Sequence, residues 1–296
     1  MKTGLLVLAV ALTTPLSSEA GPITTNTALP VHDGVLIVRA QGKLLRATGD
    51  PGRQDRALTV WAVPTVLVYG ATERWALFGV IPYLDKTLEL NTSAGRRSRG
   101  DAGLGDLRFF ARYSALQWDS PGETLRLAPF LGIEVPTGRD DASDDLGRLP
   151  PPLQLGSGSW DPFLGLVFTW QTLGWELDTS LSYDVETRAN DFELGDVLRL
   201  DASFQHRVWP RELGDGVPGF LYLVAESSLV WQDRSQRAGT TDPSSGGTTW
   251  FLTPGIQYIT RRFIVEGAVQ LPAVQDLGTG ALETDLIVTA GFRVNF

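Results

Sequence analysis

The chain closes on Asp285-Leu-Ile-Val-Thr-Ala-Gly-Phe-Arg-Val-Asn-Phe296, where apolar residues alternate with mostly small or polar ones. Successive side chains of a strand point to opposite sides, so this alternation predicts a strand with one wholly apolar face. That face carries Leu286, Val288, Ala290, Phe292, Val294 and Phe296. The other carries Asp285, Ile287, Thr289, Gly291, Arg293 and Asn295. The stretch therefore predicts a strand that meets an apolar medium on one side.

A final strand of this kind resembles the C-terminal strand of bacterial outer-membrane β-barrels. In those proteins the terminal Phe helps the barrel assembly machinery to recognise the chain. The resemblance implies outer-membrane lipid and that machinery as partners. An ordinary half-buried strand of a soluble protein fits the same pattern, so the rest of the chain has to decide between the two.

Composition narrows the class of protein. The 296 residues contain 32 Gly and nine Trp but a single Met, which suits a turn-rich β protein. With no Cys, disulfides, thiolate zinc sites, cysteine nucleophiles and a lipoprotein anchor are excluded. A formal net charge of -9 argues against nucleic acid as a partner, because that ligand requires a basic face.

The first twenty residues have the pattern of a signal peptide. Lys2 gives a positive start, Gly4 to Leu12 is a short apolar core, and Ser18 and Ala20 are small residues before a cleavage site. We expect residues 1–20 to be removed and the mature chain to begin at Gly21. Residues 21–33 are irregular and polar, and lie either in the periplasm or inside a lumen. Residues 34–296 are expected to form one outer-membrane barrel.

From residue 34 onward, alternating runs are separated by turns. The twelve runs are 34–45, 57–70, 73–87, 104–117, 123–136, 159–171, 174–187, 194–208, 219–232, 248–260, 262–273 and 284–296. No helical period of comparable strength competes. The fold class is therefore all-β, a transmembrane antiparallel up-and-down β-barrel of about 12 strands.

Two features favour a membrane barrel over a soluble sandwich. Short connections, such as 70–73, 171–174 and 260–262, alternate with long polar loops at 46–56, 88–103, 137–158 and 233–247. Short periplasmic turns and long external loops are typical of outer-membrane barrels. The Trp residues fall near both ends of the runs, as expected of indoles at two membrane interfaces. They are Trp75, Trp118, Trp170, Trp175 and Trp209 at the short-turn end, and Trp61, Trp160, Trp231 and Trp250 at the long-loop end.

Three motifs resemble one family. They are Gly103-Leu-Gly-Asp-Leu-Arg108, Leu131-Gly-Ile-Glu-Val-Pro-Thr-Gly138 and Leu153-Gln-Leu-Gly-Ser-Gly-Ser-Trp-Asp-Pro162. The chain is similar here to the outer-membrane proteins named for the meta pathway of phenol degradation, which are labelled as transporters. The resemblance implies a barrel and uptake of small aromatic or other hydrophobic compounds. It carries over no catalytic motif, so it assigns no site residue.

Few residues suggest catalysis or metal binding. His206 follows Asp201 and Ser203, but it falls on the opposite strand face, so the three cannot form a triad. Gly103 and Gly105 open a strand and lack the third glycine of a nucleotide loop. The carboxylates of Asp140, Asp141, Asp144 and Asp145 fit no calcium-loop spacing, and a solvated acidic loop is expected. We predict no cofactor and no metal.

Charged residues on the inward faces are the candidate solute path, because buried charges require water or partners. They are Arg39, Lys43, Asp106, Arg108, Arg112, Arg126, Glu134, Glu176, Asp178, Asp184, Glu186, Arg199, Asp201, Glu226, Glu266 and Arg293. They form either a wet passage with basic and acidic walls or pairs that cross the lumen and close it.

The sequence predicts a channel or transporter that passes or binds small solutes and has no catalytic role. Two other functions fit a barrel: an integral enzyme that acts on lipids, and a closed structural barrel. A soluble secreted β protein is the remaining alternative to a barrel.

Overall fold

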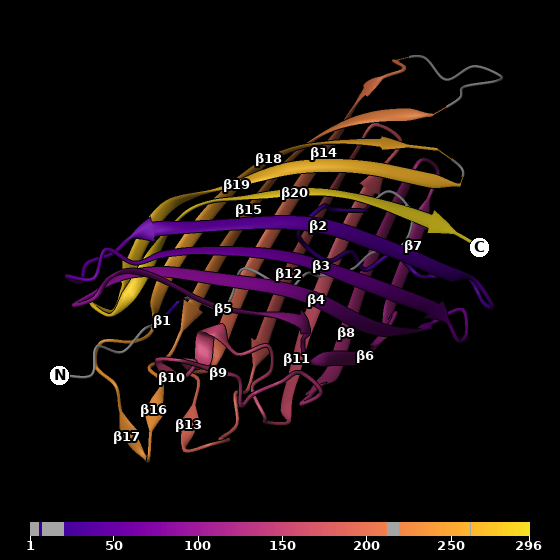
Figure 1. Cartoon of the computed structure of the whole chain (residues 1–296). Helices are drawn as coiled ribbons and strands as arrows, with labels where there is room; N and C mark the ends of the chain where they lie inside the picture. The colour runs from indigo at the N-terminus through magenta and orange to yellow at the C-terminus, as the bar shows by residue number, and fades with distance from the viewer. Residues whose placement is uncertain (1–5, 8–20, 212–218, 261) are drawn as a thin grey trace.

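The computed structural model describes residues 6–7, 21–211, 219–260 and 262–296, and its regular structure is almost entirely β (Figure 1). The long strands are β2 (Leu36–Gly49), β3 (Ala57–Gly70), β4 (Trp75–Thr92), β5 (Gly95–Leu104), β6 (Leu107–Tyr113), β7 (Leu116–Ser120), β8 (Glu123–Val135), β11 (Asp161–Thr172), β12 (Trp175–Asp184), β14 (Val197–Trp209), β15 (Phe220–Gln232), β18 (Gly247–Ile259), β19 (Phe263–Leu277) and β20 (Ala281–Asn295). None of the described helices is long and apolar enough to cross a membrane.

The long strands close into a barrel. Each pairs antiparallel with its neighbour along the chain, and β20 returns to pair with β2, with Ile37 opposite Asn295. β5, β6 and β7 follow one another as a single interrupted strand of the wall. Counted in this way, the fourteen long strands form a barrel of twelve strands. Closure leaves the barrel without a free first or last edge. The prediction of a twelve-stranded antiparallel barrel is confirmed.

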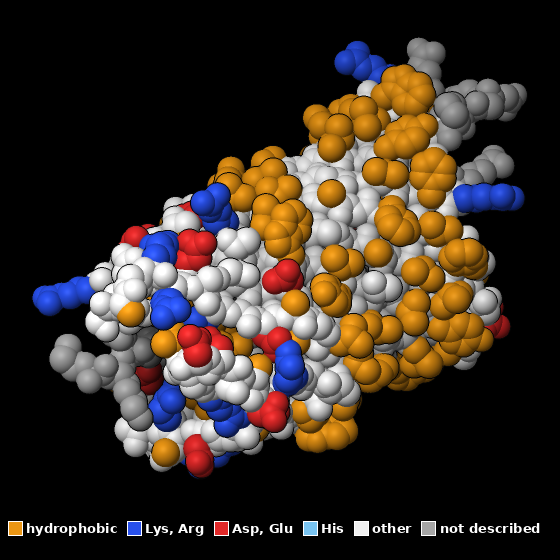
Figure 2. Space-filling model, viewed as in Figure 1, with side chains coloured by type: hydrophobic (Ala, Val, Ile, Leu, Met, Phe, Trp, Pro, Cys, Tyr) orange, Lys and Arg blue, Asp and Glu red, His pale blue; other side chains and the backbone are white. Residues whose placement is uncertain are grey.

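Alternation along the strands separates the two surfaces of the wall. On β14, Leu198 and Leu200 are exposed on the outside, whereas Arg199 and Asp201 between them are buried inside. The same alternation repeats around the barrel, so hydrophobic side chains gather on its outer surface (Figure 2). An apolar outside and a polar inside are what a bilayer requires, because lipid tails cannot solvate charges.

Long loops connect the strands at one end of the barrel, and mostly tight turns connect them at the other. Short strands lie in the loops at one end: β9 (Ser143–Asp144) with β10 (Gly147–Arg148), and β13 (Phe192–Glu193) with β16 (Gln236–Arg237) and β17 (Thr240–Thr241) (Figure 1). Charged side chains gather at this end in Figure 2. The tight turns and the C-terminus lie at the other end. We call the first the loop end and the second the turn end.

One predicted loop is a hairpin. Residues 88–103 carry Gly, Ser and Arg, which predicted irregular structure, but β4 continues to Thr92 and β5 returns from Gly95 in register. The side chains of β5 alternate between exposed and half-buried positions, with no buried face. A strand that has no buried face shows no apolar alternation in its sequence, and this is why the pattern failed here. A minor strand, β1 (Leu6–Val7), pairs in parallel with β20.

Candidate functional site

The segment that precedes the barrel lies inside it. Residues 21–29 are all buried, and Thr25, Thr27 and Ala28 have no exposed surface. A polar segment of this kind could lie in the periplasm or in the lumen, and the structure places it in the lumen. It crosses the turn-end half of the barrel between the walls that carry Glu226 and Arg112. We call residues 21–31 the inner segment.

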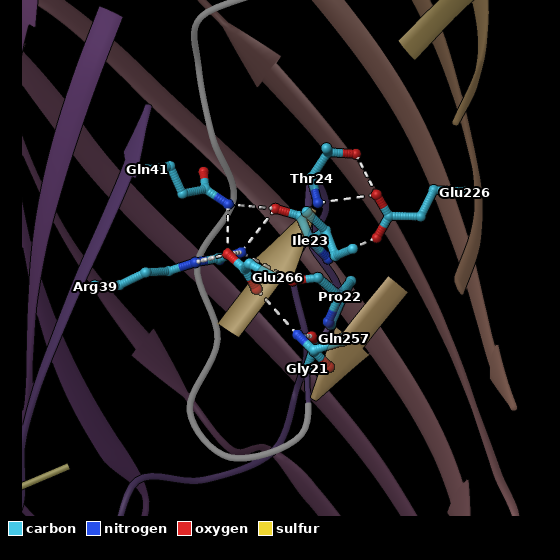
Figure 3. Close-up of polar contacts among 9 residues, drawn as sticks. All are labelled: Gly21, Pro22, Ile23, Thr24, Arg39, Gln41, Glu226, Gln257 and Glu266. Carbon is cyan, nitrogen blue, oxygen red and sulfur yellow. Dashed lines mark hydrogen bonds and ion pairs between the residues drawn. The ribbon is translucent and has the colours of Figure 1, made fainter. Parts of the chain in front are cut away.

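Charged side chains of the wall hold one part of the inner segment by its backbone (Figure 3). The carboxylate of Glu226 accepts hydrogen bonds from the backbone N–H groups of Ile23 and Thr24, at 2.8 and 2.9 Å. The carbonyl of Ile23 accepts from the Arg39 guanidinium at 2.7 Å and the Gln41 amide at 2.9 Å. An irregular segment has no ladder to satisfy its peptide groups, so wall side chains take that role.

A second set of contacts holds the other part of the segment. The Arg112 guanidinium donates to the carbonyls of Thr27 and Leu29, and the Thr169 hydroxyl accepts from the N–H of Ala28 at 2.6 Å. The methyl group of Ala28 joins an apolar cluster with Phe130. Hydrogen bonds from the wall at Glu226 and from the wall at Arg112 therefore hold the inner segment, which fills the turn-end half of the lumen.

A second filling enters from the loop end. The loop 137–158 turns inward, and its residues Ala142, Leu149 and Leu153 are buried against apolar side chains of the wall. Those side chains are Leu45, Ala47, Leu58, Val60, Leu88, Phe251, Leu282 and Ile287. Lys86 also donates to the carbonyls of Pro152 and Gln154, at 3.2 and 2.5 Å. The loop-end half of the lumen thus has a local hydrophobic core. It is built around the loop 137–158, whose composition had predicted a solvated loop.

Asp106 fastens this inward loop. Its carboxylate accepts from the N–H of Gly138 at 2.8 Å, and from the N–H and hydroxyl of Ser157 at 2.6 and 3.0 Å. A Cβ at Gly156 would lie 2.6 Å from both an Asp106 oxygen and the Gly138 carbonyl, so no larger residue fits there. The three sequence motifs that resemble one family converge at this point. Their shared role here is to hold the loop inside the barrel.

A cavity of about 220 Å³ remains between the two fillings. Asn26 of the inner segment and Pro151, Pro152 and residues 154–157 of the loop are among its lining residues. The wall contributes Pro64, Val80, Pro82, Leu84, Lys86, Asp106, Arg108, Phe110, Phe130, Glu134, Phe163, Ser180, Ser182, Asp184, Arg199 and Asp201. We call this the inner cavity.

A larger cavity, of about 810 Å³, lies at the loop end. It shares Pro151, Gln154, Gly156, Ser157 and Leu194 with the inner cavity, so these residues lie at the boundary between the two. The remaining wall of this outer cavity comes from the loops that carry β10, β13 and β17. The two cavities follow one another from the loop end towards the inner segment.

Aromatic rings form one wall of the inner cavity. The Phe110 ring lies 5.8 Å from Phe130 and 5.9 Å from Phe163, and stacks on Phe78 at 4.2 Å, measured between centroids. Glycines make the room for them, since a Cβ at Gly132 would lie 2.3 Å from the Phe163 ring. A Cβ at Gly165 would lie at the same distance from the Phe130 ring. In the pairing of β8 with β11, Phe163 lies opposite Gly132, and Phe130 lies opposite Gly165.

The charged groups of the inner cavity pair with one another. Arg108 contacts Asp184 at 2.5 Å and Glu134 at 3.5 Å, and its guanidinium lies 4.1 Å from the centre of the Phe163 ring. Arg199 binds Asp201 at 2.8 Å. Charges paired in this way leave the apolar side chains as the cavity's distinguishing surface.

The inward charges predicted from the sequence all lie inside the barrel or at its mouth, but in different surroundings. Those at the inner cavity are Asp106, Arg108, Glu134, Asp184, Arg199 and Asp201, and Glu186 lies in the outer cavity. Those that contact the inner segment are Arg39, Arg112, Asp178 and Glu226, and Lys43, Glu176, Glu266 and Arg293 are also buried inside the barrel. Arg126 lies at the turn end and pairs with Asp119. Ion pairs within one strand or between strands close together thus replace separate basic and acidic walls.

Glu186 lies beyond the end of β12, in the loop that leads to β13. Burial raises the pKa of its carboxyl to about 9, and the carboxylates of Asp161 and Glu134 act in the same direction. A carboxyl with this pKa is neutral at pH 7. It therefore contributes a hydrogen-bond donor to the outer cavity and no charge.

The residues considered for catalysis or metal binding do not come together into a site among the described residues. His206 is exposed, whereas Asp201 and Ser203 are buried, as their strand faces predicted. In the acidic loop, Asp144 binds Arg99 and Asp140 accepts from Asn190, so their carboxylates point to different partners. Within the described residues, no three His, Asp or Glu side chains are grouped so that they could hold a metal ion.

Sequence reasoning missed the aromatic wall. Phe110 and Phe163 were not recognised as inward-facing, because apolar residues occupy both faces of their strands. The signal that could have found them is Gly132, which lies directly across the ladder from both Phe110 and Phe163.

Residues 56–270 match the family model described as "Putative MetA-pathway of phenol degradation". The chain belongs to this family. The match covers more than half of the sequence and includes all three motifs at Asp106. No curated protein matched the chain.

Solved structures share the fold at low sequence identity. The COG4313 outer-membrane channel from Pseudomonas putida F1 superimposes with a TM-score of 0.71 and 15% identity, over 93% of this chain and all of that one. The translocator domain of the autotransporter NalP from Neisseria meningitidis gives a TM-score of 0.49 and 13% identity, over 90% of this chain and 91% of that one. The first likeness shows that this chain has the fold of that channel.

Proposed function

We propose that the protein is an outer-membrane channel for small, largely apolar solutes, aromatic compounds among them. The observation that carries the proposal is the inner cavity, where three phenyl rings face a space of about 220 Å³. Apolar pockets with a few polar groups bind small organic molecules, and offset or edge-on rings add to the affinity for another ring. The paired charges of Arg108 and Arg199 keep the remaining wall from repelling such a solute.

The proposed route runs from the outer cavity past Leu194 and Pro151 into the inner cavity. Onward passage requires the inner segment to move, because it fills the turn-end half of the lumen. The inward charges that lie outside the two cavities would then line the turn-end part of the path and solvate it. We propose passage without catalysis. Lipid hydrolysis by the purified, folded protein would contradict this part of the proposal.

Block of ion current tests the cavity. The wild-type protein is incorporated in planar bilayers, and phenol, benzyl alcohol and cyclohexanol are added in turn. Phe163→Leu removes one ring from the cavity and should weaken block by the two aromatic compounds about 2- to 12-fold, the range that one aromatic pair contributes. Block by cyclohexanol should change less. Phe204→Leu, a similar change on the outer surface, is the matched control. Equal effects of the two variants would refute the cavity as the solute site.

We also propose that the chain reaches the membrane by export and assembly from its last strand. The N–H of Phe296 bonds to the carbonyl of Leu36 at 2.9 Å, and the Phe296 side chain is exposed. A side chain that adds little to the finished barrel is available for recognition during assembly. Phe296→Ser should reduce the heat-modifiable, membrane-inserted protein, and Asp285→Ser should not. Normal assembly of the first variant would remove the support for this recognition.

A further inference from the structure

Gly21 lies at a polar cluster inside the barrel. Its carbonyl accepts a hydrogen bond from the Gln257 amide at 2.9 Å, and the same amide nitrogen donates to Glu266 Oε2 at 3.0 Å. Gln257 thus holds the Gly21 backbone beside the Glu266 carboxylate (Figure 3). Gly21, Gln257 and Glu266 are all buried.

Two oxygen atoms in this cluster accept fewer hydrogen bonds than they could. Glu266 Oε1 accepts three hydrogen bonds, two from Arg39 and one from Gln41, whereas Oε2 accepts only the Gln257 amide among the described residues. Gln257 Oε1 is buried and has no hydrogen-bond partner there. Leaving a buried acceptor unpaired costs about 1–3 kcal/mol, so a fixed, buried amide oxygen without a donor calls for an explanation.

We propose that Glu266 Oε2 and Gln257 Oε1 form a receptor for the α-ammonium group of Gly21 in the mature chain. The proposal rests on cleavage after Ala20 and is independent of the transport function. A signal peptidase would hydrolyse the Ala20–Gly21 bond with one water molecule. This leaves a carboxylate on Ala20 and an amine on Gly21, which takes up a proton. Cleavage thus creates a cation with up to three donors beside the two acceptors.

The electrostatics of the cluster fit this assignment. An ammonium group inside the barrel is costly unless it is paired and hydrogen-bonded. Glu266 already pairs with Arg39, but through the other oxygen, so the guanidinium does not occupy the position that the ammonium would take. Glu226 accepts hydrogen bonds from the neutral N–H groups of Ile23 and Thr24, so its carboxylate is already engaged further along the segment. The first residue would thereby anchor the inner segment that fills the lumen.

Acetylation of amines tests the receptor, because Lys43 and Lys86 are the only lysines after Gly21. The mature protein is treated with N-hydroxysuccinimidyl acetate, and mass spectrometry measures the rate at each amine. The Gly21 amine of the folded protein should react at least about tenfold more slowly than that of the detergent-unfolded chain, since a charge-assisted hydrogen bond must open first. A rate equal to that of the unfolded chain would overturn the proposal.

Two variants test whether slow acetylation of the Gly21 amine is due to the proposed receptor or to burial alone. Gln257→Met removes the acceptor at similar volume and should raise the rate in the folded protein about tenfold. Gln270→Met is the matched control, because the Gln270 amide oxygen is also buried without a partner, on the same wall. Insertion of Ala before Gly21 moves the ammonium by about 3.5 Å, changes no wall residue, and should raise the rate as well. Equal rates in the two Met variants, or a mature chain that does not begin at Gly21, would refute the assignment.

Discussion

The two fillings of the lumen are held by different forces. The backbone of the inner segment accepts hydrogen bonds from Arg112 and donates them to Glu226, and the side chains of Ile23, Ala28 and Val31 lie in three separate apolar clusters. The loop 137–158 meets the wall mostly through Leu149, Leu153 and Ala142, which are buried in the largest apolar cluster of the structure. The inner segment therefore combines charge-assisted hydrogen bonds with apolar contacts spread over three clusters, whereas the loop 137–158 places its apolar side chains in one continuous cluster.

This difference bears on which filling can move. Water can replace hydrogen bonds to a backbone when a segment leaves its site, so even a bond to a charged side chain contributes only about 1.5–3 kcal/mol net. Exposure of an apolar cluster has no such compensation and costs roughly 25 cal/mol per Å². We therefore expect the inner segment to open the lumen, whereas the loop 137–158 stays and shapes the inner cavity.

Deletion of residues 21–31 should have the largest effect. It removes the filling of the turn-end half and the cavity lining at Asn26, so single-channel conductance in planar bilayers should rise several-fold. The control is deletion of residues 145–146, the exposed tip of the loop between β9 and β10. If both deletions leave conductance as it is, the inner segment is not what limits it.

Arg112→Met should have the next largest effect. The side chain donates to two carbonyls of the inner segment, and hydrogen bonds from charged groups contribute about 1.5–3 kcal/mol each. Its loss should raise the open fraction in single-channel records by roughly tenfold or more. Arg74→Met changes an exposed arginine of a tight turn and should leave the open fraction unchanged. A similar open fraction in both variants would contradict a gating role for the inner segment.

Asp106→Asn should act more weakly and on the other filling. Replacement of one carboxylate oxygen by an amide breaks some of the bonds to Gly138 and Ser157, at a cost of about 1–3 kcal/mol, but the apolar cluster remains. Trypsin should then cut faster after Arg139 and Arg148. Asp145→Asn, at an exposed position of the same loop, is the control. Unchanged cleavage of the Asp106 variant would show that apolar burial alone holds the loop.

Titration of Glu186 should give the smallest effect. Its pKa is raised to about 9, chiefly by burial, so the carboxyl is neutral below that pH and ionised above it. Reversal potentials measured under a salt gradient should shift towards cation preference as the pH rises through about 9. Glu186→Gln should lack this shift, because an amide does not ionise there. An identical pH profile for the variant would assign the titration to another group.

Sequence patterns predicted the wall of the barrel well and its contents poorly. Alternation identified the outward Phe292 and the inward Arg293, because each strand side chain faces either the lipid or the lumen. It also placed the lumen charges, although their partners, such as Glu134 and Asp184 for Arg108, came only with the structure. Alternation failed at β5, where no face is buried, and at Phe110 and Phe163, where both faces are apolar.

The sequence by itself determined that the chain forms a barrel of about twelve strands, because the alternation of side chains is a local property of each strand. Only the tertiary structure decided what fills that barrel. The contacts of Asp106 with Gly138 and Ser157, and of Arg112 with Thr27, join residues far apart in the chain. Such contacts leave no periodic trace, because they depend on which strands become neighbours when the barrel closes. The aromatic cavity exists for the same reason: its rings and their glycines meet only across paired strands.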